Sequence, residues 1–437
     1  MHDWCYFCYL FKPNSLAVFF YNIFLLLFKA GIHAAVPFSP KAAQWVRGRK
    51  QVFEKLAAAI PPGEKIVWMH CASLGEFEQG RPLLEKMREI YPEYRFLLTF
   101  FSPSGYEIQK NYKGADWVFY LPADSAGNAR RFLEIVHPCL VIFVKYEFWY
   151  YYLKKIKYRN IPLILVSALF RKDMSFFKWY GGLQRKMISR FDHLFVQNQS
   201  SAGLMEEIGL SSITSISGDT RFDRVIEIAG RFEPIPAIEQ FIGKDRCLIA
   251  GSTWPADEEV LASALNSNAA PPLKLILAPH EIGEKHIVDI EKLFPDSIRF
   301  SRLSTWNNGP EKTLIIDNIG MLSRLYRYGW LTYIGGGMEK NGVHNVLEAA
   351  VYEKPVLFGP FYQKYTEATG LVNAGGGISF TDNNKDGEML RELICMLADD
   401  PDEYQQRCRA AAAFVQSNKG ATQKILQYIQ EKRLLTS

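Results

Sequence analysis

The sequence predicts an α/β protein built from two doubly wound, Rossmann-like domains. Short apolar runs rich in Val, Ile and Phe alternate with amphipathic stretches, and the alternation restarts after a proline-bearing segment, FEPIPAIEQF. A chain of 437 residues is also too long for one ordinary core. Apolar strands separated by helical segments indicate parallel sheets. Such sheets bind ligands at the carboxyl ends of their strands, so we expect a GT-B-like arrangement in which the two domains face a cleft.

The composition is that of a folded globular protein, with 48% hydrophobic and 22% charged residues. A net charge of +5 is only mildly basic, so we expect no nucleic-acid partner. The seven cysteines are scattered, which indicates reduced thiols in place of a disulfide framework. Cys5 and Cys8 form a lone CxxC pair, and two ligands make a weak zinc site, so we expect no metal.

The N-terminus is strongly apolar. The run from Leu16 to Phe28 is interrupted only by Asn22, and apolar residues continue after Lys29. A spanning helix needs roughly 20 apolar residues. The basic group Arg47, Arg49 and Lys50 would keep its side of the segment in the cytoplasm. We expect residues 1–45 to be a membrane-associated segment that lies on or marginally spans the bilayer; the alternative is a buried first helix.

The first predicted domain covers residues 46–216, with strands in KIVWMH, RFLLTFF, WVFYLP, CLVIFVKY, IPLILVSAL and HLFVQN. Loops that follow strands are where a rigid scaffold presents functional groups. The candidates after the first, second and fourth strands are Ser73, Gly75, Glu76, Ser102, Ser104, Lys145 and Glu147. The basic and aromatic residues that follow, up to Lys186, suit lipid headgroups or an ordinary solvated face.

The second predicted domain covers residues 217–437, with strands in CLIAGS, LKLILAP, TLIIDN, LTYIGGG, KPVLFGP and GGGISF. Gly336 and Gly337 end a strand and would let backbone amides approach a ligand. His344 and Asn345 are expected to open a helix whose N-terminus suits phosphate, with Glu348 one turn on to bind ribose hydroxyls. Further donor-side candidates are Ser252, Thr253, His280 and Arg221. Ser252 and Thr253 could equally be helix caps.

Several motifs in order carry a family resemblance: SLGEFEQGRPLL, TFFSPSG, GDTRFD, GSTWPADEE and GVHNVLEAAVYEKPVLFGP. Together with the apolar N-terminus they resemble the 3-deoxy-D-manno-octulosonic acid (Kdo) transferases of lipopolysaccharide synthesis, from about Tyr21 to the C-terminal region.

The resemblance implies a metal-independent, inverting glycosyltransferase that needs no cofactor. Such an enzyme moves Kdo from CMP-Kdo to lipid IVA, the lipid A precursor, on the cytoplasmic face of the inner membrane. It implies that Glu76 is the catalytic base, that Glu147 of the Glu-x-Trp motif is functionally important, and that Asn345 and Glu348 bind the cytidine nucleotide. The alternatives are another GT-B enzyme that uses a UDP- or GDP-sugar, or a non-catalytic nucleotide- or lipid-binding protein attached to the membrane.

Three positions depart from the family pattern. Pro279-His280-Glu281-Ile282 replaces the common Pro-Arg-His-Pro, Lys145 stands where an acid is common, and Trp254 replaces the His of GSTH. The role of these neighbours in substrate binding is therefore open.

Glu76 lies in the first turn of a predicted helix, where a phosphate loop would have Gly and Lys. A helix N-terminus favours the charged form of a carboxylate, so Glu76 is expected to be ionised and able to act as a base. Positioned proton removal typically contributes about 10²–10⁴-fold to rate. The rest would come from stabilising the departing phosphate, in which Arg221 could take part. Without the family pattern, Glu76 would be an ordinary first-turn acid.

Overall fold

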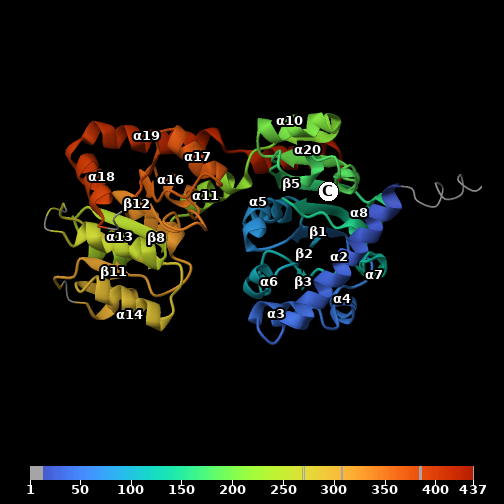
Figure 1. Ribbon diagram of the computed structural model, residues 1–437, viewed down its shortest axis with the longest axis horizontal. Helices are drawn as coiled ribbons and strands as arrows, with labels where there is room; N and C mark the ends of the chain where they lie inside the picture. The colour runs from blue at the N-terminus through green and yellow to red at the C-terminus, as the bar shows by residue number, and fades with distance from the viewer. Residues whose placement is uncertain (1–12, 268, 270, 307–308, 383–385, 437) are drawn as a thin grey trace, which may run out of the picture. The chain divides into compact units, whose positions relative to one another are not determined.

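The computed structural model describes residues 13–267, 269, 271–306, 309–382 and 386–436. Cys5 and Cys8 lie outside these residues. The chain divides into two compact units: unit 1 comprises Met1–Arg224 with Gly420–Ser437, and unit 2 comprises Val225–Lys419. Figure 1 draws unit 1 mainly in blue and green and unit 2 mainly in yellow and orange.

Unit 1 contains a parallel sheet of seven strands in its described part, in the order β3-β2-β1-β4-β5-β6-β7. The strands are β1 (Ile66–Cys71), β2 (Arg95–Phe100), β3 (Trp117–Tyr120), β4 (Pro138–Val144), β5 (Leu163–Ala168), β6 (His193–Val196) and β7 (Thr214–Ile216). The strand order reverses direction between β1 and β4, so a ligand is expected at the carboxyl ends of these two strands.

Helices cover both faces of this sheet, which explains why its strands are continuously apolar. Trp68 of β1 belongs to one core cluster with Phe132 of α7, while its neighbour Met69 belongs to the opposite cluster with Phe77 of α5. The helices are α2 (Pro13–Ala35), α3 (Pro40–Gly48), α4 (Val52–Ala59), α5 (Leu74–Ile90), α6 (Pro103–Gln109), α7 (Ala126–Val136), α8 (Tyr150–Tyr158), α9 (Gly182–Ile188) and α10 (Gln199–Glu207), with short 3-10 turns at Ser175–Phe177 and Ser211–Ile213.

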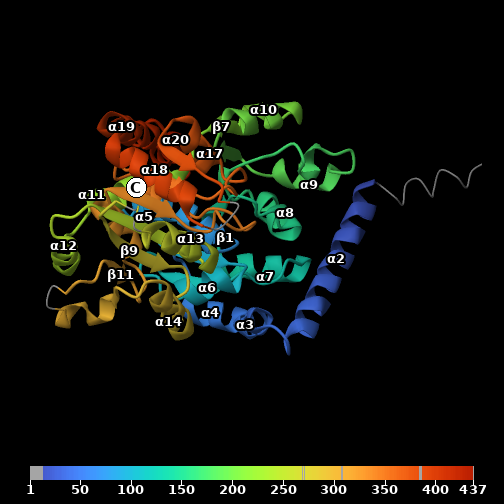
Figure 2. The same cartoon turned by 60° about the vertical axis from the view of Figure 1, so that its left-hand side comes forward.

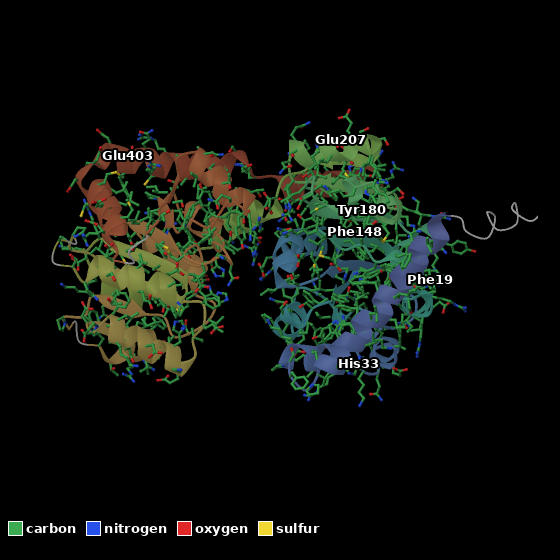
Figure 3. The ribbon with its side chains drawn as sticks, viewed as in Figure 1. Phe19, His33, Phe148, Tyr180, Glu207 and Glu403 are labelled. Carbon is green, nitrogen blue, oxygen red and sulfur yellow. The ribbon has the colours of Figure 1, made fainter. Side chains whose placement is uncertain are left out.

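The long helix α2 lies along the outer side of unit 1 (Figure 2). Tyr21 donates a hydrogen bond to Asp124 (2.7 Å), and Asn22 accepts one from Tyr151 (2.8 Å). Further along, Phe28 stacks on Phe101 with a centroid separation of 5.9 Å. The opposite face of α2 is apolar and exposed, with Leu16, Phe19, Phe20, Phe24, Leu26 and Leu27 each between 46% and 68% exposed. Figure 3 labels Phe19 and His33 on this helix.

The last helix, α20 (Ala421–Glu431), returns to unit 1 and packs on α5 through Ile425, Leu426 and Ile429. Its first turn is held by Asp223, which accepts hydrogen bonds from the backbone N–H groups of Gly420 (2.6 Å) and Thr422 (2.7 Å). Figure 1 shows this red helix among the blue and green elements of unit 1.

Unit 2 contains a second parallel sheet of seven strands in its described part, in the order β10-β11-β9-β8-β12-β13-β14. The strands are β8 (Cys247–Thr253), β9 (Lys274–Pro279), β10 (Ser297–Arg299), β11 (Thr313–Ile315), β12 (Leu331–Ile334), β13 (Val356–Phe358) and β14 (Gly377–Ser379). Here the order reverses direction between β8 and β12.

Helices α13, α14 and α18 supply side chains to one core cluster of unit 2, where Leu261, Ile287 and Ile394 pack with Leu248 of β8. The helices are α12 (Pro236–Ile242), α13 (Pro255–Leu265), α14 (Glu284–Leu293), α15 (Leu322–Leu325), α16 (Leu347–Ala350), α17 (Thr366–Asn373), α18 (Glu388–Asp399) and α19 (Pro401–Ser417), with 3-10 turns at Phe300–Thr305 and Tyr326–Tyr328; α11 (Thr220–Gly230) contains the boundary between the units.

The predicted fold class is confirmed: both halves are parallel, doubly wound α/β units, and the apolar N-terminus is helical. Unit 1 extends to Arg224, past the expected boundary at residue 216, because Thr220 and Arg224 of α11 form hydrogen bonds with Gln79 and Glu85 of α5. The strand β7 was not predicted. The C-terminal residues from Gly420 belong to unit 1, although they were expected in the second domain. The short strand β10 was also not predicted.

Candidate active site

Glu76 lies in the first turn of α5, directly after β1. Ser73 is the N-cap residue, with extended backbone, and its hydroxyl donates a hydrogen bond to Oε2 of Glu76. The S-x-x-E spacing is typical of helix starts, but here the two side chains bond each other and Ser73 makes no side-chain cap. Glu76 remains partly exposed, and Gly75 beside it is exposed. The carboxylate is therefore held in place at the carboxyl end of β1 without being sealed in the core.

Glu147 follows β4, the strand next to β1, and is only 8% exposed. Its Oε2 lies 2.8 Å from Nε2 of His70 and accepts a hydrogen bond from the Trp149 indole at 2.6 Å. His70 is fully buried in β1, and its Nδ1 lies 2.8 Å from the hydroxyl of Thr99 in β2. A continuous polar chain thus runs across three adjacent strands to the carboxylate of Glu147.

The remaining unit 1 candidates lie on the loops around these two carboxylates. Ser102 caps α6 and contacts the hydroxyl of Ser104 at 3.0 Å. The backbone N–H of Ser102 donates to the carbonyl of Ala72 (2.7 Å), which ties the β2 loop to the β1 loop. Lys145 has φ of 67°, an uncommon left-handed conformation for a non-glycine residue, immediately before the Glu147 turn.

A cavity of about 380 Å³ lies between α2 and these loops. Its lining includes apolar groups from both sides: Leu25, Leu26, Phe28, Phe101 and Trp149. The Trp149 ring packs on Phe101 with a centroid separation of 4.6 Å, and the same Trp149 bonds Glu147. An apolar space of this kind, next to a buried carboxylate, suits part of a lipid-like molecule.

Arg221 lies in unit 1, although it was predicted as a donor-binding residue of the second domain. Its guanidinium makes an ion pair with Asp219, with Nη2 2.6 Å from Oδ2. Asp219 is buried, so this pair orders the start of α11.

In unit 2 the glycine turn after β12 is tightly packed. A Cβ at Gly337 would lie 2.7 Å from the backbone nitrogen of Gly359, and one at Gly335 would lie 2.3 Å from the carbonyl oxygen of Ser252. The backbones that follow β8, β12 and β13 therefore approach one another more closely than residues with side chains allow.

Asp257 of α13 organises this turn. Its fully buried carboxylate accepts hydrogen bonds from the backbone N–H of Gly336 (2.8 Å), the Tyr333 hydroxyl (2.7 Å) and the backbone N–H of Trp254 (2.9 Å). The Gly336 amide is thus used inside the protein and is not offered to a ligand as expected. Within the described part of the chain, the Gly337 amide donates to no protein acceptor.

The prediction that His344 and Asn345 open a helix is wrong. The helix α16 begins at Leu347 and has four residues, too few to give a strong dipole at its N-terminus. Asn345 instead caps it, accepting from the backbone N–H of Leu347 (3.2 Å) and donating to Glu348 (3.0 Å). The two residues do lie together, as the sequence predicted.

The end of β8 is bulged, which separates its two hydroxyl candidates. Ser252 has φ of 54° and is partly exposed, while Thr253 is fully buried. The Thr253 hydroxyl donates to Glu258 (2.9 Å), and Glu258 in turn lies 2.8 Å from His286. Thr253 is therefore a structural residue here, and only Ser252 is available to a ligand.

Three aromatic rings stack beside the glycine turn: Trp254, His280 and His344. The His280 ring lies 4.7 Å from Trp254 and 4.6 Å from His344, with interplanar angles of 24° and 20°. The Trp254 indole donates a hydrogen bond to Nε2 of His344 at 2.9 Å. Burial, together with the neighbouring His280, lowers the pKa of His344 to about 4.

No group of three or more His, Cys, Asp or Glu side chains with the geometry of a metal site occurs among the residues that the structure describes.

Comparisons with known proteins find similarity to one family of transferases. The family described as 3-Deoxy-D-manno-octulosonic-acid transferase (kdotransferase) matches residues 47–224. A 3-deoxy-D-manno-octulosonic acid transferase of Haemophilus influenzae is 25% identical over 422 residues, which cover 93% of this chain and 97% of that protein. Over most of its length the chain is therefore similar to Kdo transferases.

A second 3-deoxy-D-manno-octulosonic acid transferase, from Aquifex aeolicus, is 27% identical over 339 residues, which cover 75% of this chain and 86% of that protein. The fold agrees with solved structures. A glycosyltransferase from Rickettsia africae has a TM-score of 0.55 at 14% identity, covering 84% of this chain and 98% of that chain. A putative UDP-N-acetylglucosamine 2-epimerase from Listeria monocytogenes has a TM-score of 0.59 at 15% identity, covering 86% and 98%. These likenesses show a GT-B-like fold.

Sequence reasoning missed three residues that organise the site: His70, Thr99 and Asp257. His70 and Thr99 sit inside strands predicted to be apolar, and a polar side chain in a buried strand was the available signal. Asp257 was not among the candidates, although an acid at the third position of a helix that follows a strand is able to bind a neighbouring loop.

Proposed function

We propose that this protein moves Kdo from CMP-Kdo to the lipid A precursor lipid IVA with inversion at the anomeric carbon. The observation that carries the proposal is the placement of Glu76 and Glu147 after β1 and β4, the two strands that flank the reversal of strand order in unit 1. Similarity to Kdo transferases supports the reaction class.

In the proposed reaction, Glu76 accepts the proton of an acceptor sugar hydroxyl. The hydroxyl oxygen then forms a bond to the anomeric carbon of Kdo, while the bond from that carbon to the CMP phosphate oxygen breaks and CMP leaves with the electron pair. The hydrogen bond from Ser73 holds one carboxylate oxygen, which reduces the entropy lost when the base is aligned.

Glu147 is proposed to orient the acceptor in unit 1, together with Ser102, Ser104 and Lys145. Its bonds to His70 and Trp149 fix the carboxylate before the acceptor arrives. The apolar cavity lined by Phe28, Phe101 and Trp149 offers room for an apolar part of the lipid. Preorganisation of this kind is a general source of catalytic power.

Unit 2 is proposed to bind the CMP-Kdo donor. The Gly337 amide, Ser252, His280 and His344 are candidates for its phosphate and carboxylate, and the Asn345–Glu348 pair for its ribose hydroxyls. The proposed reaction requires neither a metal nor another cofactor.

We further propose that α2 lies on the cytoplasmic face of the inner membrane without spanning it. By length and composition, Leu16–Ala35 is apolar enough to cross a bilayer. However, contacts at Tyr21, Asn22 and Phe28 attach one side of α2 to unit 1, which leaves only the other side for lipid. A cavity of about 340 Å³ beside α2 is lined by three basic residues, Lys29, Arg49 and Lys50, and one acidic residue, Glu54, and this excess of positive charge suits anionic lipid headgroups.

Flotation with anionic phospholipid vesicles tests this attachment. The triple variant Phe19→Ser, Phe20→Ser, Phe24→Ser should lose most vesicle binding, whereas Ile319→Ser, an exposed apolar residue of unit 2, should not. Equal binding by both variants would contradict the proposal for α2.

The transfer reaction is tested by incubating the purified protein with CMP-Kdo and lipid IVA. The mass of the lipid product is then measured by mass spectrometry. We expect a product heavier by whole Kdo units. A lipid that changes only when a UDP- or GDP-sugar is supplied would favour another GT-B activity, and no product with any donor would favour a binding protein.

A further inference from the structure

Two positions that depart from the family pattern, Trp254 and His280, contact each other and His344 in unit 2. Trp254 follows β8, His280 follows β9, and His344 follows the glycine turn after β12, so three separate loops supply one stack of rings. The planes of Trp254 and His344 differ by only 10°. His280 therefore lies over a hydrogen-bonded pair of rings.

The bond between Trp254 and His344 fixes which ring nitrogen of His344 carries a proton. An indole N–H is a donor only, so Nε2 of His344 must accept with its lone pair. A neutral imidazole with an unprotonated Nε2 carries its proton on Nδ1. Protonating Nε2 would set two donors against each other at 2.9 Å, so the charged form of His344 is disfavoured.

The position of the ring is fixed as well as its tautomer. Gly336 has φ of 87°, and a Cβ there would lie 2.9 Å from Cδ2 of His344. The backbone N–H of His344 also donates to the carbonyl of Gly335 at 3.1 Å. Within the described residues, Nδ1 of His344 has no hydrogen-bond partner in the protein.

We propose that Trp254 is a positioning residue that holds His344 as the neutral Nδ1–H tautomer, so that this N–H binds an oxygen of the nucleotide donor. The ligand class is an acceptor oxygen of a nucleoside monophosphate. The inference rests on the proposed donor-binding role of unit 2 and adds the form in which His344 acts.

The tautomer is measured directly by ¹⁵N NMR of protein labelled at histidine, with the His344 signals assigned from a His344→Gln sample. The key variant is Trp254→Phe, which keeps an aromatic ring but removes the indole N–H. The matched control is Trp306→Phe, because Trp306 also lies in unit 2 and donates its indole N–H, to Glu311 at 2.7 Å. Thermal unfolding confirms that both variants are folded.

We expect the wild type and Trp306→Phe to show an unprotonated Nε2 at His344, and Trp254→Phe to lose this preference. Binding of CMP, measured by calorimetry on the full chain, should weaken about 3- to 10-fold in Trp254→Phe, the range expected for one neutral hydrogen bond. Trp306→Phe should bind CMP like the wild type.

A wild-type spectrum with the proton on Nε2, or an unchanged tautomer in Trp254→Phe, would overturn the inference. A changed tautomer with unchanged CMP affinity would overturn the part that assigns a ligand to Nδ1. If CMP fails to bind even the wild type, the proposed donor role of unit 2 fails, while the spectra still decide the role of Trp254.

Discussion

The two units share one fold but present different chemistry at the carboxyl ends of their strands. In unit 1 these ends carry ionisable side chains held by other side chains: Glu76 by Ser73, and Glu147 by His70 and Trp149. In unit 2 they carry a glycine turn and a stack of aromatic rings. A Cβ added at any of Gly335, Gly336 and Gly337 would lie less than 3 Å from a backbone atom.

This difference suggests a division of labour. Side-chain carboxylates on fixed supports suit proton transfer and acceptor alignment, whereas the backbone amide of Gly337 and the His344 ring suit recognition of a nucleotide. A doubly wound sheet can support either proton transfer or nucleotide recognition, since the function depends on the residues at the strand ends and not on the fold. The variants below alter one unit at a time.

Apart from the loss of the proposed base itself, the largest effect is expected from Gly337→Ala in unit 2. A Cβ there would lie 2.7 Å from the backbone nitrogen of Gly359, which has no flexible side chain to move aside. Misplacing this turn by about 1 Å should weaken CMP binding about 100-fold. Calorimetry measures the loss.

The control for that variant is Gly127→Ala in α7 of unit 1, where an added Cβ meets nothing within 4 Å. It should leave CMP binding unchanged and raise the free energy of unfolding by about 0.5–1 kcal/mol. Normal CMP binding by Gly337→Ala would remove the glycine turn from the donor site.

A smaller effect is expected from His70→Gln in unit 1. Because His70 lies between Thr99 and Glu147, its replacement loosens the support of Glu147. We expect kcat to fall about 10-fold, as for loss of other residues that orient a functional group, while the donor KM stays unchanged. The matched control is His193→Gln, since His193 is in the same sheet and bonds Ser215 (2.8 Å) away from these loops. A changed donor KM in His70→Gln, or an equal loss in the control, would contradict the division between the units.

The smallest effect concerns acid stability, to which both units should contribute. Burial lowers the pKa of His193 to about 4, with a further contribution from Lys432. Burial and His280 lower the pKa of His344 to about 4. Between the ordinary value of about 6.5 and 4, the unfolded chain binds protons that the folded chain does not, so stability should fall as pH decreases through this window.

Thermal unfolding followed from pH 7 to pH 4.5 checks this prediction. His193→Gln and His344→Gln should each flatten part of the curve. A wild-type melting temperature that does not change in this range would show that neither histidine is held neutral by the fold.

Features set by neighbouring residues could be predicted from the sequence. The strand, turn and helix around Glu76, and the glycine turn after β12, are local patterns, and both are present. Pairings between distant segments could not be predicted. His70 forms a hydrogen bond with Glu147, which is 77 residues away in the sequence. Asp257 accepts a hydrogen bond from the backbone N–H of Gly336, which is 79 residues away.

The same limit explains one error in domain organisation and one in secondary structure. The amphipathic segment of α20 is equally compatible with packing on either unit, and only the tertiary structure places Ile425 and Leu426 on α5. The His-Asn-x-Leu-Glu segment reads as a helix start, but contacts of its backbone with Gly335 and Phe361 keep Val343 and His344 out of the helix.

The central claim is that a carboxylate of unit 1 removes the acceptor proton while unit 2 binds the donor. The most direct test is Glu76→Gln, with single-turnover transfer from CMP-Kdo to lipid IVA and the dissociation constant of CMP measured on the same preparation. We expect the rate to fall about 10²–10⁴-fold with CMP affinity unchanged. Transfer at the wild-type rate, or loss of CMP binding together with transfer, would contradict it.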